Sequence, residues 1–433
     1  MSSQLKIAPP LVGNIRGSFA YTTVKDRWPK IVTKVVDQLH RKYHDLVKEV
    51  NEQAGKDATY IISKISEMRY RMETNKPLLD FEPTDSHFVE LNAELKKLRA
   101  EYGGDEKVTF YDAPWLFSEC YLYAKLHEFV LATETLKTYD IFAEEKKKAY
   151  DDSLAQITAI SVELVDWEAD PQTDVKAAIL RLIQVALWGN KCDLSLSCGD
   201  PHQMAGNMFN QLDSFRHTIL ADDIDAAVEH LATKCAGRTL HVVLDNSALE
   251  LFTDMALAEF LVARGLVKDV VFHGKSYPWF VSDVTANDYN WVLQSLADNE
   301  NQAVSTIGKR WQRRPEFSFR HADFWTTTHS YWDLKSKAPM LFDELKSSAL
   351  TIFKGDLNYR KLVADRDWPY DIDLKFAVQS MSEIPFFALR TLKAETVAGI
   401  SQKSLDVIKA KYESTDKSWM FSSDWAVAQL NLP

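Results

Sequence analysis

The chain has 433 residues, of which 46% are hydrophobic and 26% charged, a composition typical of soluble globular proteins with roughly two or three domains. Its net charge of −11 argues against binding to nucleic acids or anionic membranes, so an anionic ligand must meet positive charge locally. No run approaches the ~18 apolar residues of a membrane span, and the N-terminal sequence lacks a signal-peptide core, which predicts a cytosolic or nuclear location.

Residues 1–170 predict a helical N-terminal domain. Apolar residues recur at helical spacing from residue 28 onward, and further helices are expected over residues 57–73 and 85–101. A long aromatic-rich helix follows Asp112, which can cap it, with Pro114 in its first turn. Glu119 lies in the apolar face of that helix, where a carboxylate is either a structural hydrogen-bonding group or part of a site wall.

A further helix is expected over residues 175–188, and the turn-forming segment WGNKCD follows at its end. Asn190 and Asp193 are polar residues in this segment. They either project into a cleft or only cap the helix and the turn that follows it.

Strands and helices alternate from residue 239 onward, which predicts a layered α/β domain within residues 171–433. Strands are expected over residues 239–244, 267–273, 349–353 and 386–392. Each is followed by charged or polar residues. Because ligands bind at the carboxyl ends of strands in open α/β sheets, we expect these residues to converge on one rim.

Two carboxylates and an amide follow the first two of these strands. Asp245 and Asn246 come directly after the first strand, and Asp283 lies in the loop beyond the second. Oxygen ligands of this kind suit Mg²⁺ or Mn²⁺ and leave coordination positions for water and substrate. We therefore expect these three residues to hold a divalent metal ion.

Four cationic residues near the last two strand ends suit a phosphate in an otherwise acidic protein. These residues are Lys354, Arg360, Arg390 and Lys393. Gly355 would let the backbone approach the ligand, while Asp356 and Asn358 could bind sugar hydroxyls. The pattern predicts hydrolysis of a phosphomonoester by metal-activated water. The alternative for Arg390 and Lys393 is an ordinary exposed strand end, so the prediction depends on all four cationic residues occurring together.

The sequence lacks the motifs of other phosphate-binding and nucleotide-binding enzymes. No G-x-G-x-x-G follows a strand, and the segment Gly274-Lys275-Ser276 lacks the earlier glycine of a P-loop. A covalent aspartyl-phosphate enzyme of the haloacid dehalogenase type would carry Asp-x-Asp after a strand, whereas this strand ends in Asp245-Asn246-Ser247. Attack by water is therefore favoured over a covalent intermediate.

Five segments together resemble the metal-dependent damage-control phosphatase family, in its eukaryotic subgroup with an Arg-Thr-x-Lys motif. They are LWGNKCDLS (187–195), VVLDNSALEL (242–251), FHGKSYPWFVSDV (272–284), IFKGDLNYRKL (352–362) and RTLK (390–393). The similarity extends along nearly the whole chain, because GSFAYTTVKDRWPKIV and DAPWLFSECYLY also look like N-terminal blocks of that subgroup.

The resemblance implies a three-layer α/β/α Rossmann-like domain with a helical N-terminal domain and a site for Mn²⁺, Co²⁺, Ni²⁺ or Mg²⁺. Members act on sugar phosphates such as fructose 1-phosphate, and fructose 6-phosphate is also handled. By matching motifs, Asp245, Asn246 and Asp283 would bind the metal, and Asn190 and Asp193 would lie beside it. Substrate contacts are implied for Asp245, Asn246, Asp356, Leu357, Asn358, Tyr359, Arg360 and Lys393.

A second activity is attached to the same subgroup, the transfer of a methyl group from S-adenosylmethionine to glutamate side chains of proteins. Glu250 matches the position that contacts this cofactor. The sequence does not favour this alternative, because no glycine-rich methyltransferase loop follows a predicted strand. Glu250 also fits a structural role in the first turn of its helix, where a negative charge is stabilised.

Overall fold

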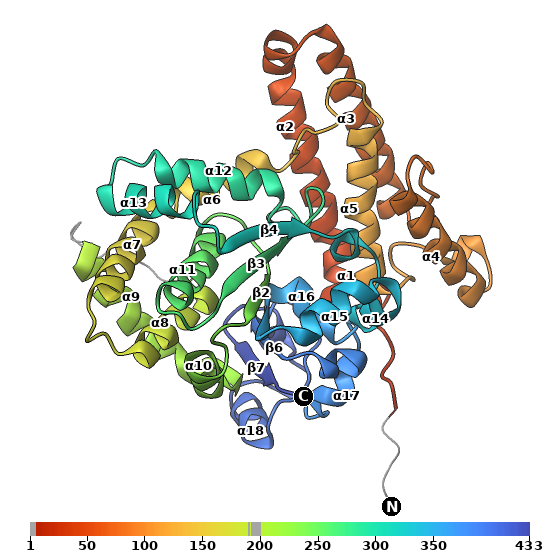
Figure 1. Ribbon diagram of the computed structural model, residues 1–433. Helices are drawn as coiled ribbons and strands as arrows, with labels where there is room; N and C mark the ends of the chain where they lie inside the picture. Colours follow the sequence, from red (N-terminus) through yellow and green to blue (C-terminus); the bar gives the residue numbers. More distant parts are fainter. Residues whose placement is uncertain (1–5, 189–190, 192–200) are drawn as a thin grey trace, which may run out of the picture.

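The computed structural model describes residues 6–188, 191 and 201–433 and shows a helical N-terminal region beside a layered α/β region (Figure 1). The helices α2, α3 and α5 form an elongated group that projects away from the sheet. The N-terminal region contains α1 (Phe19–Thr22), α2 (Trp28–Glu49), α3 (Glu52–Glu73), α4 (Ser86–Tyr102) and α5 (Trp115–Leu131).

A mixed sheet forms the centre of the α/β region, with seven strands among the described residues. These are β1 (Ile219–Asp222), β2 (Thr239–Val243), β3 (Asp269–Gly274), β4 (Phe317–His321), β5 (Leu350–Lys354), β6 (Phe386–Thr391) and β7 (Ala426–Asn431). Their order is β1-β7-β6-β5-β2-β3-β4, and the five strands from β6 to β4 are parallel. β7 runs antiparallel to β6 and parallel to β1.

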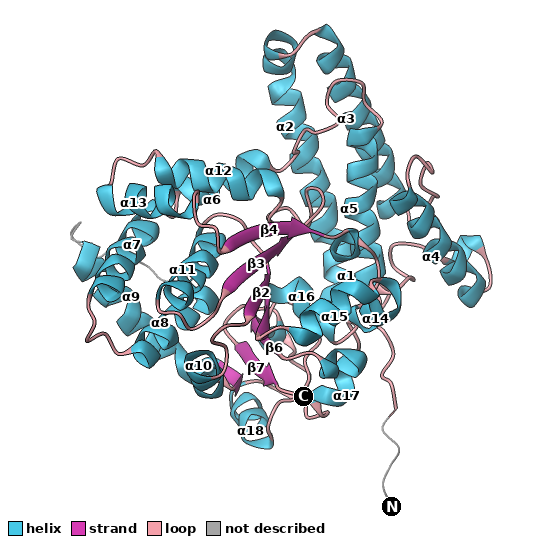
Figure 2. Ribbon diagram, viewed as in Figure 1, coloured by secondary structure: helices cyan, strands magenta, loops and turns pink. Residues whose placement is uncertain are grey.

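Helices cover both faces of the sheet, as Figure 2 shows. One face packs against α6 (Ala143–Asp151), α7 (Leu154–Ala169), α8 (Val175–Trp188), α9 (Pro201–Phe215), α10 (Ile224–Thr233), α11 (Leu249–Ala263), α12 (Ala286–Ala297) and α13 (Gln302–Trp311). The other face packs against α14 (Leu334–Lys337), α15 (Pro339–Ser347), α16 (Gly355–Leu362), α17 (Leu374–Val378) and α18 (Gln402–Lys411). The predicted α/β/α layering with a helical N-terminal region is confirmed. Within the described ranges, we find no helix with the length and apolar character needed to cross a membrane.

Between Phe142 and Tyr150 the chain passes from one hydrophobic core to another. Phe142 belongs to the core of the helical N-terminal region, whereas Tyr150 and the buried residues of α7 pack with the helices on the sheet. The domain boundary drawn at residue 170 stays a prediction.

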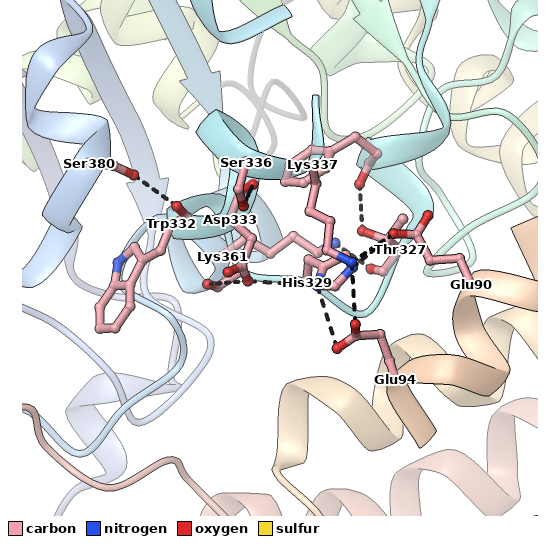
Figure 3. A network of polar contacts seen from close by, with 12 residues as sticks. Glu90, Glu94, Thr327, His329, Trp332, Asp333, Ser336, Lys337, Lys361 and Ser380 are labelled. Atoms are coloured by element: carbon pink, nitrogen blue, oxygen red, sulfur yellow. Dashed lines mark hydrogen bonds and ion pairs between the residues drawn. The ribbon is translucent and has the colours of Figure 1, made fainter. Parts of the chain in front are cut away.

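A polar network joins the helical region to the sheet region (Figure 3). Glu90 of α4 accepts a hydrogen bond from Lys337 at 3.1 Å and lies 3.3 Å from His329 Nε2. Lys361 of α16 donates to the carbonyl oxygen of Thr327 at 2.7 Å. The segment 327–337 therefore bridges α4 and α16, and α16 is the helix that begins at the candidate site.

The strand order reverses between β2 and β5. From β2 the chain proceeds to β3 and β4 on one side, and from β5 it proceeds to β6 and β7 on the other. Val243 of β2 lies in register with His273 of β3 and Phe353 of β5, so the three strands end at the same level. Such a reversal opens a crevice at the carboxyl ends of the strands, where α/β proteins bind ligands.

Candidate active site

The loops after β2 and β3 are joined by backbone contacts. Asn246 and Asp283 form an antiparallel bridge, and the Val284 amide donates to the Asp245 carbonyl oxygen at 3.0 Å. The Ser247 amide donates to the Ser282 carbonyl oxygen at 2.8 Å. Residues that are far apart in sequence thus form one wall, as the strand order predicts.

Asp245 and Asp283 are buried carboxylates in this wall, with 7% and 2% of their surfaces exposed. Burial raises the pKa of Asp283 to about 6, against the attraction of Lys275. Burial, together with the negative charges of Glu250 and Asp283, also raises the pKa of Asp245 well above its ordinary value. The wall therefore holds negative charge that burial disfavours, a condition that a bound cation would relieve.

The predicted metal ligands fit a divalent cation in their chemistry. Asp283 Oδ2 is buried and makes no hydrogen bond with any described residue, although it lies 3.2 Å from Lys275 Nζ.

Across the described ranges, no group of three or more His, Cys, Asp or Glu side chains is placed to hold a metal ion. The predicted set has two carboxylates, and its third donor is the amide oxygen of Asn246. The metal assignment accordingly stays a prediction.

Gly355 brings the start of α16 against Asp245. Its φ of +81° lies in the left-handed region that favours glycine, and a Cβ placed there would lie 1.8 Å from Asp245 Oδ2. Asn358 secures this approach, because its amide nitrogen donates to the carbonyl oxygens of Val243 and Leu244, both at 3.2 Å. The first-turn N–H groups of α16, which lack acceptors within their own helix, are thereby placed beside the buried carboxylate.

A cavity of about 200 Å³ lies at this point. Several elements of the α/β region line it, and the lining residues include Trp188, Asp245, Glu250, Gly355, Thr391, Lys393 and Ser423. The backbone N–H of Lys393 donates to Asp356 Oδ1 at 3.0 Å. The exposed ammonium group of Lys393 forms no ion pair or hydrogen bond within the described part of the chain, and Lys393 lines the cavity together with Asp245 and Glu250.

Arg390 is fully buried and structurally engaged. Its guanidinium donates to Asp356 Oδ1 at 2.8 Å and to the carbonyl oxygens of Thr396 and Ala394, and it stacks 4.5 Å above the Tyr359 ring. Although burial opposes ionisation, the charges of Arg390 and Arg360 lower the pKa of Asp356. Arg390 therefore holds the loop after β6, and with it Lys393, against the start of α16.

Arg360 is likewise held by protein partners. It donates to Glu119 Oε2 at 2.6 Å and to both carboxylate oxygens of Asp365 at 2.9 and 3.0 Å, and it lies 3.9 Å from the centre of the Trp115 ring. Trp28 donates to the other oxygen of Glu119 at 3.1 Å. Of the two interpretations of Glu119, the structure supports the structural hydrogen-bonding group, which ties the helical region to α16.

The variant Arg360→Met is expected to lower the free energy of unfolding by about 3–5 kcal/mol, because it leaves two buried carboxylates without their cation. Urea unfolding followed by circular dichroism would measure this loss. The matched control is Arg320→Met, since Arg320 pairs with Glu344 at the surface with 54% of its side chain exposed. That change is expected to cost less than about 1 kcal/mol. Equal effects of the two substitutions would contradict the structural role of Arg360.

Lys354 is enclosed at the end of β5. Its ammonium lies 2.8 Å from the Ala186 carbonyl oxygen, 3.0 Å from Glu250 Oε1 and 2.8 Å from Asp254 Oδ1. Although burial opposes its charge, these two carboxylates raise its pKa. The charge of Lys354 is thus balanced by Glu250 and Asp254. Because its ammonium is already engaged by these carboxylates and by Ala186, it is not placed to donate to a phosphate as predicted.

Comparison with known proteins identifies the family. A model described as "Damage-control phosphatase ARMT1-like domain" matches residues 23–407. The chain belongs to this family. It is 34% identical over 441 residues to the Danio rerio protein named "Damage-control phosphatase ARMT1", with 98% of each chain covered. The Homo sapiens protein of that name is 33% identical over 440 residues, with 98% of each covered. The Mus musculus protein is 34% identical over 430 residues, which covers 96% of this chain and 97% of that protein. The predicted family is confirmed.

The remaining residues implied by the damage-control phosphatase motifs lie in different surroundings. Leu357 packs into the core of the helical region, and the hydroxyl of Tyr359 donates to Gln429 at 2.8 Å. Glu250, the position implied for S-adenosylmethionine, is held by Lys354 and by Asn246. Asn190 and Asp193 lie outside the described residues.

Lys275 lies at the candidate site but was not predicted to do so. In the sequence it was considered only as part of an incomplete P-loop. It directly follows β3, has 1% of its surface exposed, and donates to the Leu244 carbonyl oxygen at 2.9 Å while lying 3.2 Å from Asp283 Oδ2. A lysine directly after a buried strand was the available signal. Its contacts fix Asp283 relative to the end of β2.

Proposed function

We propose that this protein is a metal-dependent phosphatase that hydrolyses small sugar phosphates, such as fructose 1-phosphate and fructose 6-phosphate, in the cytosol or nucleus. The observation that carries this proposal is the contact between the buried Asp245 carboxylate and Gly355 at the start of α16, with Lys393, whose ammonium has no partner among the described residues, lining the same cavity. Membership of a family of damage-control phosphatases supports it.

The phosphate group would bind between the N-terminus of α16 and Lys393. Backbone N–H groups at the start of a helix attract anions, and the lysine adds a full positive charge. Lys354, Arg360 and Arg390 would act through the protein groups that they hold in place rather than by touching phosphate. A cavity of about 200 Å³ suits a small phosphorylated metabolite, whose hydroxyl groups would meet Thr391 and Ser423 at the wall.

Asp245, Asn246 and Asp283 would hold Mn²⁺, Co²⁺, Ni²⁺ or Mg²⁺. When bound, such an ion supplies positive charge for a phosphoryl oxygen and lowers the pKa of a water molecule. The protein's part is to keep two carboxylates buried at a fixed separation, with Lys275 orienting Asp283. Lys393 would stabilise the negative charge that develops on the phosphoryl group.

Phosphate release from a panel of phosphorylated metabolites tests this proposal. EDTA is expected to abolish release, and added Mn²⁺ or Co²⁺ is expected to restore it, because the two buried carboxylates cannot polarise phosphate by themselves. Hexose phosphates are expected to be hydrolysed faster than nucleotides, given the size of the cavity. Release that persists unchanged in EDTA would refute metal dependence.

Lys393→Met is expected to lower kcat/KM for sugar phosphates by about 10- to 100-fold, because a charge-assisted contact to phosphate contributes about 1.5–3 kcal/mol. Steady-state kinetics under saturating Mn²⁺ would measure it. The matched control is Lys403→Met, which removes an exposed lysine of α18. An unchanged kcat/KM in Lys393→Met would place the phosphate elsewhere.

A further inference from the structure

The amide group of Asn246 has one orientation that its surroundings permit. Its nitrogen donates to Asp245 Oδ2 and to Glu250 Oε2, both at 2.8 Å, and its oxygen accepts from the Ser282 hydroxyl at 2.5 Å. Both neighbours of the nitrogen are carboxylate oxygens, which accept hydrogen bonds and would repel an amide oxygen. The NH₂ group therefore faces Asp245 and Glu250, and the carbonyl oxygen faces the Ser282 hydroxyl.

Glu250 can impose this orientation because its own carboxylate is fixed. Its second oxygen accepts from Lys354 at 3.0 Å, and only 12% of its side chain is exposed. Lys354 is fixed in turn by Asp254 and by the last turn of α8. A chain of contacts from β5 through Lys354 and Glu250 thus ends on the side chain of Asn246.

We propose that Glu250 is a positioning residue of the metal site, which holds the Asn246 amide so that its oxygen, and not its NH₂ group, is presented to a divalent cation. This inference rests on the proposed function. An amide oxygen retains a second lone pair after accepting from Ser282, so it can bind a cation while the hydrogen bonds persist. An NH₂ group offers a cation no lone pair. Groups that orient metal ligands in this manner typically contribute 10- to 100-fold in metal affinity.

The variant Glu250→Gln separates this role from simple packing, because it conserves the shape of the side chain. Lys354 requires an acceptor, so it takes the oxygen of the introduced amide and leaves its NH₂ group facing the NH₂ group of Asn246. Two donors then oppose each other, and rotation of the Asn246 amide relieves the conflict. The dissociation constant for Mn²⁺, measured on the purified full chain by electron paramagnetic resonance, is expected to rise about 10- to 100-fold.

Glu259→Gln is the matched control. Glu259 lies on the same helix, is fully buried and pairs with Arg310 and Arg314 rather than with Asn246. This variant is expected to lower the melting temperature and leave Mn²⁺ affinity unchanged. The double variant Glu250→Gln with Lys354→Met should recover part of the affinity, because the introduced amide can then turn its oxygen toward Asn246.

An Mn²⁺ dissociation constant within twofold of the wild type in folded Glu250→Gln would overturn the inference. If that variant cannot be purified, Glu250→Asp takes its place, since its shorter side chain cannot reach both partners, and the same rise in the dissociation constant is required. Should the wild type itself bind no Mn²⁺, the proposed function fails together with this inference. If the wild type binds Mn²⁺ and hydrolyses sugar phosphates while the Glu250 variants bind Mn²⁺ normally, this inference alone fails.

Discussion

Asp245→Asn is expected to lower kcat/KM for sugar phosphates by about 1,000-fold, the upper range seen when a preorganised electrostatic group is removed. The substitution keeps the size of the side chain and its place at the end of β2. It removes one of two negative charges that would attract the cation, and it puts an NH₂ group where an oxygen ligand is required. Kinetics over a range of Mn²⁺ concentrations would measure the loss.

The same variant is expected to unfold at an equal or higher temperature than the wild type when metal is absent. Burial and the charges of Glu250 and Asp283 raise the pKa of Asp245, so its ionised form is disfavoured in the metal-free fold. A neutral side chain removes that unfavourable energy. Loss of activity with retained stability would show that Asp245 serves the reaction, whereas parallel losses of both would contradict this expectation. Differential scanning calorimetry in EDTA provides the measurement.

The strands that the sequence predicts are those with continuous apolar runs. β2, β3, β5 and β6 are buried in the middle of the sheet, where both faces are covered, and each contains at least three apolar residues. β1 has only four residues, and β4 is an edge strand with Arg320 and His321 exposed. Both were missed because neither carries a long apolar run. β7, which lies between β1 and β6 and runs antiparallel to β6, was missed as well.

The position of the candidate site follows from the sequence. Whether the lysine and arginine side chains near it are free to bind phosphate does not. The ends of parallel strands in register must meet, so the order of strands and polar residues along the chain is enough to expect Asp245, Asn246 and Asp283 together. A lysine or arginine, in contrast, binds phosphate only if no protein carboxylate has already engaged it. The partners of Arg360 and Lys354 include Glu119 on α5 and Asp254 on α11, residues far away in sequence that only the folded chain brings into contact. Lys393 differs from them because no carboxylate within the described part of the chain pairs with its ammonium.

Gly355→Ala is expected to reduce phosphatase activity at least about 100-fold, because it acts on the carboxylate of Asp245 through direct contact. The added Cβ would lie 1.8 Å from Asp245 Oδ2 and 2.2 Å from its carboxyl carbon, and real Cβ contacts do not approach below 3.0 Å. Either the carboxylate turns away from its place beside Asn246 or the start of α16 moves outward. Each outcome separates the predicted metal ligands from the N–H groups that would receive the phosphate.

Gly237→Ala is the control that isolates backbone strain from this collision. Gly237 has φ of +73°, close to the +81° of Gly355, yet nothing lies within 4 Å of the Cβ that alanine would add. It lies at the opposite end of β2, before the strand begins. Both substitutions should cost about 1 kcal/mol of stability from the left-handed backbone, with a further loss in Gly355→Ala from the displaced carboxylate. Activity should fall only in Gly355→Ala. If Gly355→Ala kept normal activity and normal Mn²⁺ affinity, α16 would not need to approach Asp245, and the N-terminus of that helix would not be the phosphate site.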